Sequence, residues 1–213
     1  MLKNSQFWKY GQYKNDIFEK MGLDLAKGKK LLDVGCGNGL DSQIFIDEFG
    51  LEVYGADIYQ DENIKNIKGL NFCLGGIEKL PFPVDAFDYV FLHDVLHHID
   101  EAKQSYQKHL EGLRELKRVC KNGGQIIILE GNRFNPLFYP HMVLMKKHNH
   151  FRQSYFIKII NETFAKVNFH FFECHFYPPR FSGFWKVYEK FMERFNFLRS
   201  FLSYNLAIID NIK

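Results

Sequence analysis

The stretch from Leu31 to Gly39 constrains the fold most, because it places three glycines within five residues directly after an apolar segment. It reads Leu-Leu-Asp-Val-Gly-Cys-Gly-Asn-Gly. The apolar residues ending at Val34 suit the end of a buried strand, and the glycines suit a turn that lets the backbone approach a ligand closely. In residues 40–49 the apolar side chains are spaced as on one face of a helix, and Gly50 is a natural end for that helix. A strand, a glycine turn and a helix form the first unit of a nucleotide-binding α/β fold.

Short apolar segments then alternate with helical patterns along the chain. This order predicts a Rossmann-like three-layer α/β sandwich with a mostly parallel seven-stranded sheet whose last strand is antiparallel. We expect one domain over residues 1–213, with an N-terminal helical cap at 1–27 and substrate-side elements at 131–165 and 178–202. The expected strands are 31–34, 51–56, 71–74, 87–92, 125–130, 167–177 and 203–210, and the expected helices are 5–21, 40–49, 61–68, a helix capped by Asp100 and running to about Cys120, 154–164 and 184–202.

Composition narrows the class of protein. The chain has 213 residues, enough for one domain with a full core, and a formal charge of +3 with its basic residues spread along the sequence. This pattern disfavours a dedicated nucleic-acid binder. Cys36, Cys73, Cys120 and Cys174 are far apart and form no C-x-x-C pair, so we expect reduced thiols and a cytoplasmic protein. We expect neither a signal peptide nor a membrane-spanning segment, because no apolar run is long enough.

Further features point to the same edge of the predicted sheet. Asp57 ends the second strand, 18 residues beyond Gly39. An acid at that place accepts hydrogen bonds from ribose hydroxyls in nucleotide-binding α/β folds, and the alternative is a surface turn or a helix cap. Residues 75–83 are rich in glycine and proline and predict a loop that can lie across an adenine. Tyr10 or Tyr13 can close over the ligand, although we expect their helix mainly to cover the core.

Landmarks between residues 31 and 130 occur in an order that resembles the class I S-adenosylmethionine-dependent methyltransferases. The G-x-G-x-G spacing of the glycine turn differs from the G-x-G-x-x-G of dinucleotide-binding folds. The resemblance implies S-adenosylmethionine as cofactor and S-adenosylhomocysteine as product, with residues 131–213 as the variable, substrate-defining part. The landmarks are Asp33-Val-Gly-Cys-Gly-Asn-Gly39, Asp57, Leu80-Pro-Phe82, Phe87-Asp88, Val95-Leu-His-His98 and Arg118-Val-Cys-Lys-Asn-Gly-Gly124.

The resemblance also assigns cofactor residues position by position. Asp57 would take the ribose hydroxyls, and Ile58 would pack on the adenine. Many relatives have an acid just before the loop residue equivalent to Ile77, where this chain has Gly76, so either Glu78 or backbone groups of Ile77 and Glu78 would bind the adenine amino group. The implied cofactor-binding residues are Asp33 at the methionine portion, then Gly35, Cys36, Gly37, Asn38, Gly39, Asp57, Ile58, Ile77, Glu78 and His93.

Three histidines within six residues follow the fourth strand. A sulfonium methyl donor mainly requires alignment of the acceptor, and an acceptor hydroxyl also benefits from a base such as histidine. We expect His93 or His97 to be the catalytic base. The alternatives are a strand-end residue touching the cofactor for His93, and helix packing or a surface position for His97 and His98. The run from His93 to His97 mimics the zinc signature H-E-x-x-H, but His93 directly follows a strand, so we expect no metal site. We expect two further pairs, His148/His150 and His170/His175, on the surface or in strands.

The sequence therefore predicts an enzyme that methylates a small molecule. Aromatic residues make up 17% of the chain and gather after position 131, which favours an apolar or ring-containing acceptor. The amphipathic helix at 184–202 can lie on a membrane or pair with another subunit, but we expect it to cover the sheet. Three alternatives remain: modification of protein or RNA, a non-catalytic cofactor-binding module, and an oxidoreductase of the related dinucleotide fold. We expect no nucleic-acid partner and a monomer or homodimer.

Overall fold

The computed structural model describes residues 5–177 and 181–213, with the backbone alone for residues 5–10 and 141. Its centre is a seven-stranded sheet in the order β3-β2-β1-β4-β5-β7-β6. Only β7 runs antiparallel to its neighbours among these strands, which confirms the predicted sheet. The strands are β1 (Lys30–Val34), β2 (Glu52–Asp57), β3 (Asn71–Leu74), β4 (Phe87–His93), β5 (Cys120–Gly131), β6 (Val167–Phe172) and β7 (Tyr204–Asp210).

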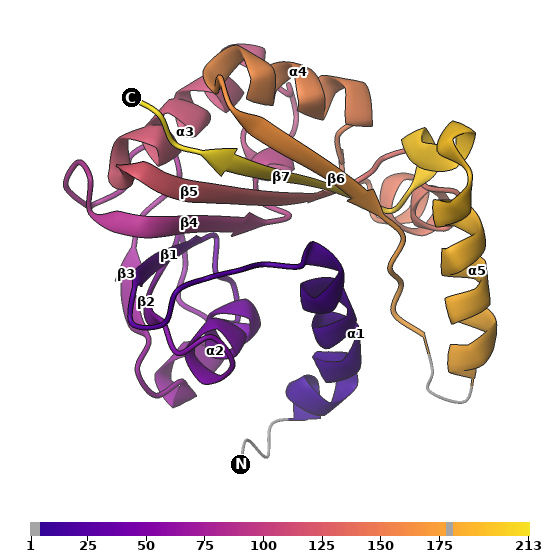
Figure 1. Ribbon diagram of the computed structural model, residues 1–213, viewed down its shortest axis with the longest axis horizontal. Coiled ribbons are helices and arrows are strands. Elements are labelled where there is room, and N and C mark those ends of the chain that lie inside the picture. The colour runs from indigo at the N-terminus through magenta and orange to yellow at the C-terminus, as the bar shows by residue number, and fades with distance from the viewer. Residues whose placement is uncertain (1–4, 178–180) are drawn as a thin grey trace.

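Helices cover both faces of this sheet, which gives the three predicted layers. Figure 1 shows α3 and α4 on one face and α1 and α2 on the other, with α5 beside the sheet. The helices are α1 (Ser5–Met21), α2 (Leu40–Asp47), α3 (Tyr106–Val119), α4 (Gln153–Thr163) and α5 (Ser182–Arg194). Shorter turns of helix lie at Glu62–Asn66, Leu96–His98 and Asn196–Phe201, and a π-helical turn lies at Tyr139–Met145. None of these described helices is both long and apolar enough to cross a bilayer.

The core explains why the central strands read as continuous apolar runs. Successive residues of a strand point to opposite faces, so both faces of a strand covered on both sides must be apolar. In β5, Ile126 and Ile128 pack with α3 and α4, whereas Ile127 and Leu129 pack with α1 and α2. Phe45 of α2 is fully buried in the second cluster.

Several predicted boundaries are wrong, each for a local reason. The helix predicted at 184–202 ends at Arg194, because the backbone is extended at Phe195 before the separate helical turn at Asn196–Phe201. Asp100 does not cap the helix: its backbone is left-handed, its carbonyl accepts from Gln104 N, and α3 begins after Ser105. The sixth strand ends at Phe172 rather than 177, because the next residue, Glu173, turns inward to bind the backbone of Ser203. The fifth strand begins earlier than predicted, at Cys120, because its pairing with β4 shifts register between Phe87 and Tyr89. The two glycines before Gln125 lie within this shift and do not end the strand.

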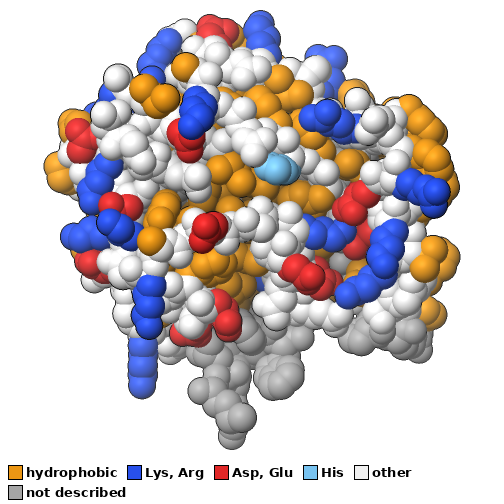
Figure 2. Space-filling view, in the orientation of Figure 1, with side chains coloured by type: hydrophobic (Ala, Val, Ile, Leu, Met, Phe, Trp, Pro, Cys, Tyr) orange, Lys and Arg blue, Asp and Glu red, His pale blue; other side chains and the backbone are white. Residues whose placement is uncertain are grey.

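The placement of α5 also differs from the prediction. Its acids point into the protein: Glu189 and Glu193 both bind Lys20 of α1, with Nζ to Oε distances of 3.0 and 2.8 Å. The aromatic side therefore faces outward, with Phe184 and Phe191 exposed. The helix does not cover the sheet with its apolar face, and Figure 2 shows hydrophobic side chains on the edge of the molecule where α5 lies.

Candidate functional site

The glycine turn between β1 and α2 forms the floor of the candidate site. Gly35 has a φ of +70°, and a Cβ there would lie 2.4 Å from Cγ2 of Val95, so only glycine fits. Gly37 has a φ of +51°, and a Cβ there would meet nothing closer than the Tyr59 hydroxyl at 4.0 Å. The turn is therefore packed tightly on the side of Val95 and open on the side of Gly37, where a ligand can approach the backbone.

Asp57 at the end of β2 braces this turn. Its Oδ2 accepts a hydrogen bond of 2.8 Å from Gly37 N, and its Oδ1 accepts a longer one of 3.3 Å from Tyr59 N. The parallel pairing of β1 with β2 places it here, because the carboxyl ends of both strands reach the same sheet edge. Neither alternative reading of Asp57, a surface turn or a helix cap, describes this buried position.

A cavity of about 690 Å³ opens over the turn. Six of the sequence-predicted cofactor residues line it: Gly35, Gly37, Asp57, Ile58, Ile77 and Glu78. The Ile58 side chain is 80% exposed, which for a large aliphatic group on a cavity wall suits contact with a flat ring. The Ile77 side chain instead packs in the core, so only its backbone can serve a ligand.

Four other predicted cofactor residues stand behind the cavity wall. Cys36 is buried with its Sγ against β2, and Asn38 and Gly39 belong to the turn that starts α2. Asp33 is buried and accepts a 2.6 Å hydrogen bond from Ser42 Oγ. Burial, reinforced by the nearby Asp41 carboxylate, raises the pKa of Asp33 to about 7. Asp33 is therefore a group that titrates near neutral pH beneath the turn.

His93, the last residue of β4, belongs to a polar network behind the cavity. Its Nδ1 lies 2.8 Å from Asp41 Oδ2 and 3.1 Å from Lys14 Nζ, and its Nε2 lies 3.7 Å from Asp94 Oδ2. Burial opposes ionisation of Asp41, but Lys14 and His93 lower its pKa below the usual range. His93 is absent from the cavity lining, and reaches the cavity through Asp94, which does line it. The neighbouring Tyr13 does not close over the cavity: its hydroxyl bonds to that of Tyr204, whereas the Tyr10 side chain lies outside the described part of the chain.

His97 forms a fully buried pair with Glu130 at the end of β5. His97 Nδ1 lies 2.8 Å from Glu130 Oε2, while Glu130 Oε1 accepts from the backbone N of Val95 and of Leu96. Burial lowers the pKa of His97, but the Glu130 carboxylate outweighs it and the pKa is raised. Glu130 therefore fixes both the turn after β4 and the orientation of the imidazole. Sequence reasoning missed Glu130, whose only signal is an acid ending an apolar strand.

One histidine of each predicted pair departs from the expected surface or strand position. His150 and His175 are buried, at 5% and 6% exposure, whereas His148 is partly exposed and His170 is exposed. His175 is held inside by a bond from its ring to Glu173. The rings of His98 and His150 lie on either side of His97, at centroid distances of 4.0 and 4.2 Å.

A second cavity of about 400 Å³ lies beside His150. Most of its wall comes from the variable segment between β5 and α4, with Gln104 from the chain before α3 and Tyr155 from α4, and it combines aromatic rings with two guanidinium groups. Because His98 lines the first cavity and His150 the second, the His97 ring stands between them. The second cavity is lined by Gln104, Arg133, Phe134, Asn149, His150, Phe151, Arg152 and Tyr155.

One protein family matches this chain. Residues 32–128 match the family described as "Methyltransferase domain". An uncharacterized methyltransferase of Schizosaccharomyces pombe is 30% identical over 68% of this chain and 51% of its own length. A tRNA U34 carboxymethyltransferase of Shewanella frigidimarina is 35% identical over 57% of this chain and 35% of its own length. A demethylmenaquinone methyltransferase of a Geobacillus species is 25% identical over 75% of this chain and 66% of its own length.

The chain thus spans between about one third and two thirds of the length of these relatives. Solved structures share the fold. Phosphoethanolamine N-methyltransferase 2 of Haemonchus contortus, solved with S-adenosyl-L-methionine, superposes with a TM-score of 0.62 at 17% identity, over 97% of this chain and 56% of that one. A SAM-dependent methyltransferase of Aquifex aeolicus gives 0.61 at 16% identity, over 97% and 93%.

Proposed function

The chain belongs to the class I S-adenosylmethionine-dependent methyltransferases, and from this premise we propose that it transfers the cofactor's methyl group to a small acceptor with an apolar or aromatic part. The observation that carries the proposal is the pairing of two cavities across the His97 ring: one lined by the glycine turn and Asp57, the other by aromatic residues of the variable segment. One cavity suits the cofactor and the other suits the acceptor.

We assign the cofactor to the cavity over the glycine turn. Asp57 keeps acceptor capacity for ribose hydroxyls, since each carboxylate oxygen here accepts one hydrogen bond and can accept another. Ile58 offers an exposed aliphatic surface to the adenine. Gly76 supplies no acid, and Glu78 lines the cavity, so Glu78 and the adjacent backbone are the adenine contacts we propose.

The methionine end of the cofactor lies toward the turn. Gly35 and Gly37 line the cavity there, with Asp33, Cys36, Asn38 and Gly39 supporting them from behind. S-adenosylmethionine supplies a methyl group already activated on a sulfonium, so the protein mainly has to align an acceptor with it. Holding two reactants in line contributes on the order of 7–11 kcal/mol to lowering a barrier.

We retain His93 and His97 as the proposed residues for proton handling. Both lie behind the cavity walls, so each acts through a neighbour: His93 through Asp94 and His97 through its contact with His98. A positioned base contributes roughly 10²–10⁴-fold. Hydrogen bonds at such sites often tighten only when substrate is bound.

The acceptor side rests on the second cavity. Phe134, Phe151 and Tyr155 provide rings against which an apolar acceptor can pack, and Arg133 and Arg152 can pair with a negatively charged group on it. Figure 2 shows hydrophobic side chains gathered along the middle of one face, between charged groups. The four free cysteines, three of them buried, agree with the proposed cytoplasmic location.

Labelling separates the candidate acceptors. The purified chain is incubated with methyl-labelled S-adenosylmethionine and a cell extract, which is then divided into small molecules, protein and RNA. Label in the small-molecule fraction supports the proposal. Label confined to RNA, with binding that weakens steeply as salt rises, or label confined to protein refutes it.

A further inference from the structure

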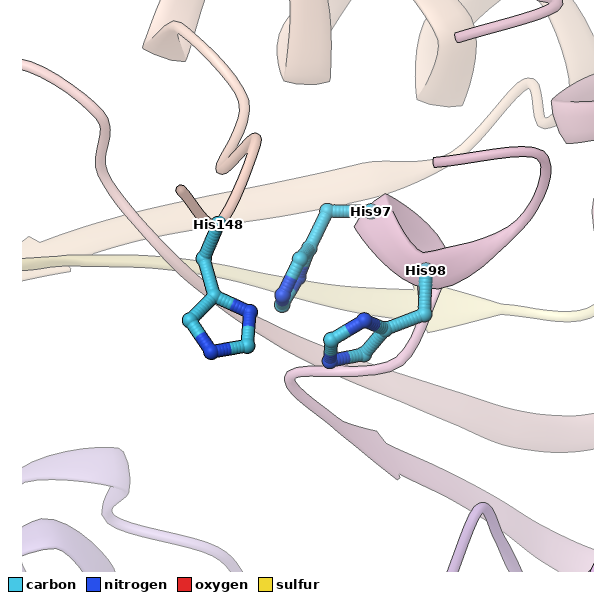
Figure 3. Close-up of side chains that lie close together, drawn as sticks. All are labelled: His97, His98 and His148. Atoms are coloured by element: carbon cyan, nitrogen blue, oxygen red, sulfur yellow. The ribbon is translucent and has the colours of Figure 1, made fainter. Parts of the chain in front are cut away.

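Three histidines from two distant segments gather at the wall between the two cavities. His97 and His98 come from the turn after β4, and His148 comes from the loop before α4. Their closest ring nitrogens lie within 4.8 Å of one another. Figure 3 shows the three rings converging on one space, His148 from one side and His97 and His98 from the other.

Carboxylates hold these rings by one nitrogen and leave the other for a ligand. Glu130 Oε2 lies 2.8 Å from Nδ1 of His97. Glu101 lies beside both other rings, at 3.2 Å from Nδ1 of His98 and 3.6 Å from Nδ1 of His148. Histidines that bind metals almost always donate their second ring N–H to a carboxylate or carbonyl, because this fixes the tautomer and the ring orientation. His97 therefore keeps its Nε2 for a ligand, and the rings of His98 and His148 each keep at least one nitrogen for one.

His150 gives an independent sign that the cluster lacks a partner. The centroid of its ring lies 4.2 Å from that of His97, with the two planes tilted by 38°, and the residue is 5% exposed. Neither of its ring nitrogens has a hydrogen-bond partner among the described residues. A buried polar group left unpaired costs about 1–3 kcal/mol. The buried ring of His150 therefore leaves its polar nitrogens without a hydrogen bond directly beside the three-histidine cluster.

We propose that His97, His98 and His148 bind one divalent transition-metal ion of the zinc class through one ring nitrogen each. Three imidazoles with an open fourth position form a known type of catalytic zinc site. Tetrahedral ligands about 2.0–2.1 Å from zinc stand roughly 3.3 Å apart. The ring nitrogens, which lie within 4.8 Å of one another, must therefore approach by up to about 1.5 Å. His98 and His148 can make that movement, since their side chains are 47% and 36% exposed.

A second grouping, Asp94, His97, Glu130 and His150, is a weaker candidate. Glu130 already accepts three hydrogen bonds, and Asp94 Oδ1 accepts a 2.7 Å bond from Gly131 N. A metal there would displace those bonds from buried groups. The trihistidine site needs no such loss, and it differs from the H-x-x-x-H pair considered in the sequence, because His93 binds Asp41 instead.

The place of the site suggests what the metal does. It lies where the proposed acceptor and cofactor cavities meet, so this role rests on the proposed function. The open position would take an oxygen or sulfur atom of the acceptor and hold it as an anion beside the methyl donor. Because Glu130 and the ion would occupy both nitrogens of His97, the acceptor's proton would pass to the other proposed base, His93, through Asp94. The chemical class of acceptor that fits is therefore a phenol, thiol or carboxylate with an apolar body.

Metal titration tests the site directly. The chain is stripped with a chelator, and Zn²⁺ binding is followed by calorimetry and Co²⁺ binding by its visible absorption. We expect one equivalent bound with tetrahedral cobalt bands. We expect His148→Ala to weaken binding at least 100-fold and Glu101→Gln about 10- to 100-fold, and we expect 2-mercaptoethanol to add a thiolate-to-cobalt band if a position is open.

Matched variants make the outcome decisive. His170→Ala removes an exposed histidine on β6 and should leave binding unchanged. Three results would overturn the assignment. The wild-type chain would fail to bind one equivalent of metal, or His148→Ala would bind metal as tightly as the wild type. In the third, His150→Ala would lose metal binding while His148→Ala kept it. Circular dichroism checks that each variant folds. Binding of S-adenosylmethionine is measured separately. If the chain binds the cofactor but no zinc, only the metal site is refuted. If it binds zinc but not the cofactor, only the proposed function is refuted.

Discussion

Replacing Asp57 by alanine removes the proposed ribose acceptor and the brace on the glycine turn together. Asp57 Oδ2 accepts from Gly37 N at 2.8 Å, and the side chain lines the cavity. Hydrogen bonds to a charged group contribute about 1.5–3 kcal/mol each. Loss of the two ribose bonds, partly replaced by water, corresponds to about 3 kcal/mol, or on the order of 100-fold in Kd. We expect that loss for S-adenosylmethionine and S-adenosylhomocysteine alike, because both carry the ribose.

Calorimetry with both ligands measures this effect. Asp61→Ala is the matched control, because it removes an acid of the same loop that caps the turn at Glu62–Asn66 and does not line the cavity. The control should retain wild-type affinity. If Asp57→Ala binds as tightly as the wild type, or if both variants lose affinity equally, the assignment of the ribose to Asp57 is refuted.

Three further predictions concern buried groups of the site. Since the pKa of Asp33 is raised to about 7, ionising it costs stability: the wild type should lose about 1.4 kcal/mol per pH unit between pH 5 and 7 relative to Asp33→Asn in urea unfolding, and parallel curves would contradict this. Glu130→Gln should destabilise by about 3–5 kcal/mol by unpairing His97. Because the raised pKa of His97 stabilises the protein below the unfolded value near 6.5 and ceases to do so above the folded value, the loss should be largest at pH 6, and a loss that grows with pH would contradict it. Gly35→Ala should lower the stability by about 2 kcal/mol, because a left-handed Cβ costs about 1–2 kcal/mol and also displaces Val95, and an unchanged melting temperature would refute this.

Patterns within short stretches of sequence were enough to predict the sheet and the predicted cofactor residues that line the first cavity. The glycine turn and Asp57 come from adjacent strand ends, where composition alone dictates a turn and the parallel pairing sets the neighbours. Ile58, Ile77 and Glu78 followed from the resemblance and do line the cavity. The seven strands and the reversed direction of β7 were likewise predicted from the alternation of elements and from the family pattern, whereas the order of the strands in the sheet was not.

The rest depends on contacts between distant segments. The Glu130 to His97 pair joins residues 33 apart, and no periodicity shows that an acid ending one strand holds the turn after its neighbour. The buried position of His150 is set by the contact of its ring with that of His97, not by its own sequence context. The outward face of α5 is determined by Lys20 at the other end of the chain, because pairing with Glu189 turns the acidic side inward.

The central claim is that this chain consumes S-adenosylmethionine to methylate a small molecule. Mass spectrometry of S-adenosylhomocysteine tests it most directly, with the purified chain given S-adenosylmethionine and the low-molecular-weight fraction of a cell extract. We predict that S-adenosylhomocysteine accumulates only when that fraction is present, and much more slowly with Asp57→Ala. Absence of S-adenosylhomocysteine from a chain that binds the cofactor, or the same amount without the fraction, would contradict the account.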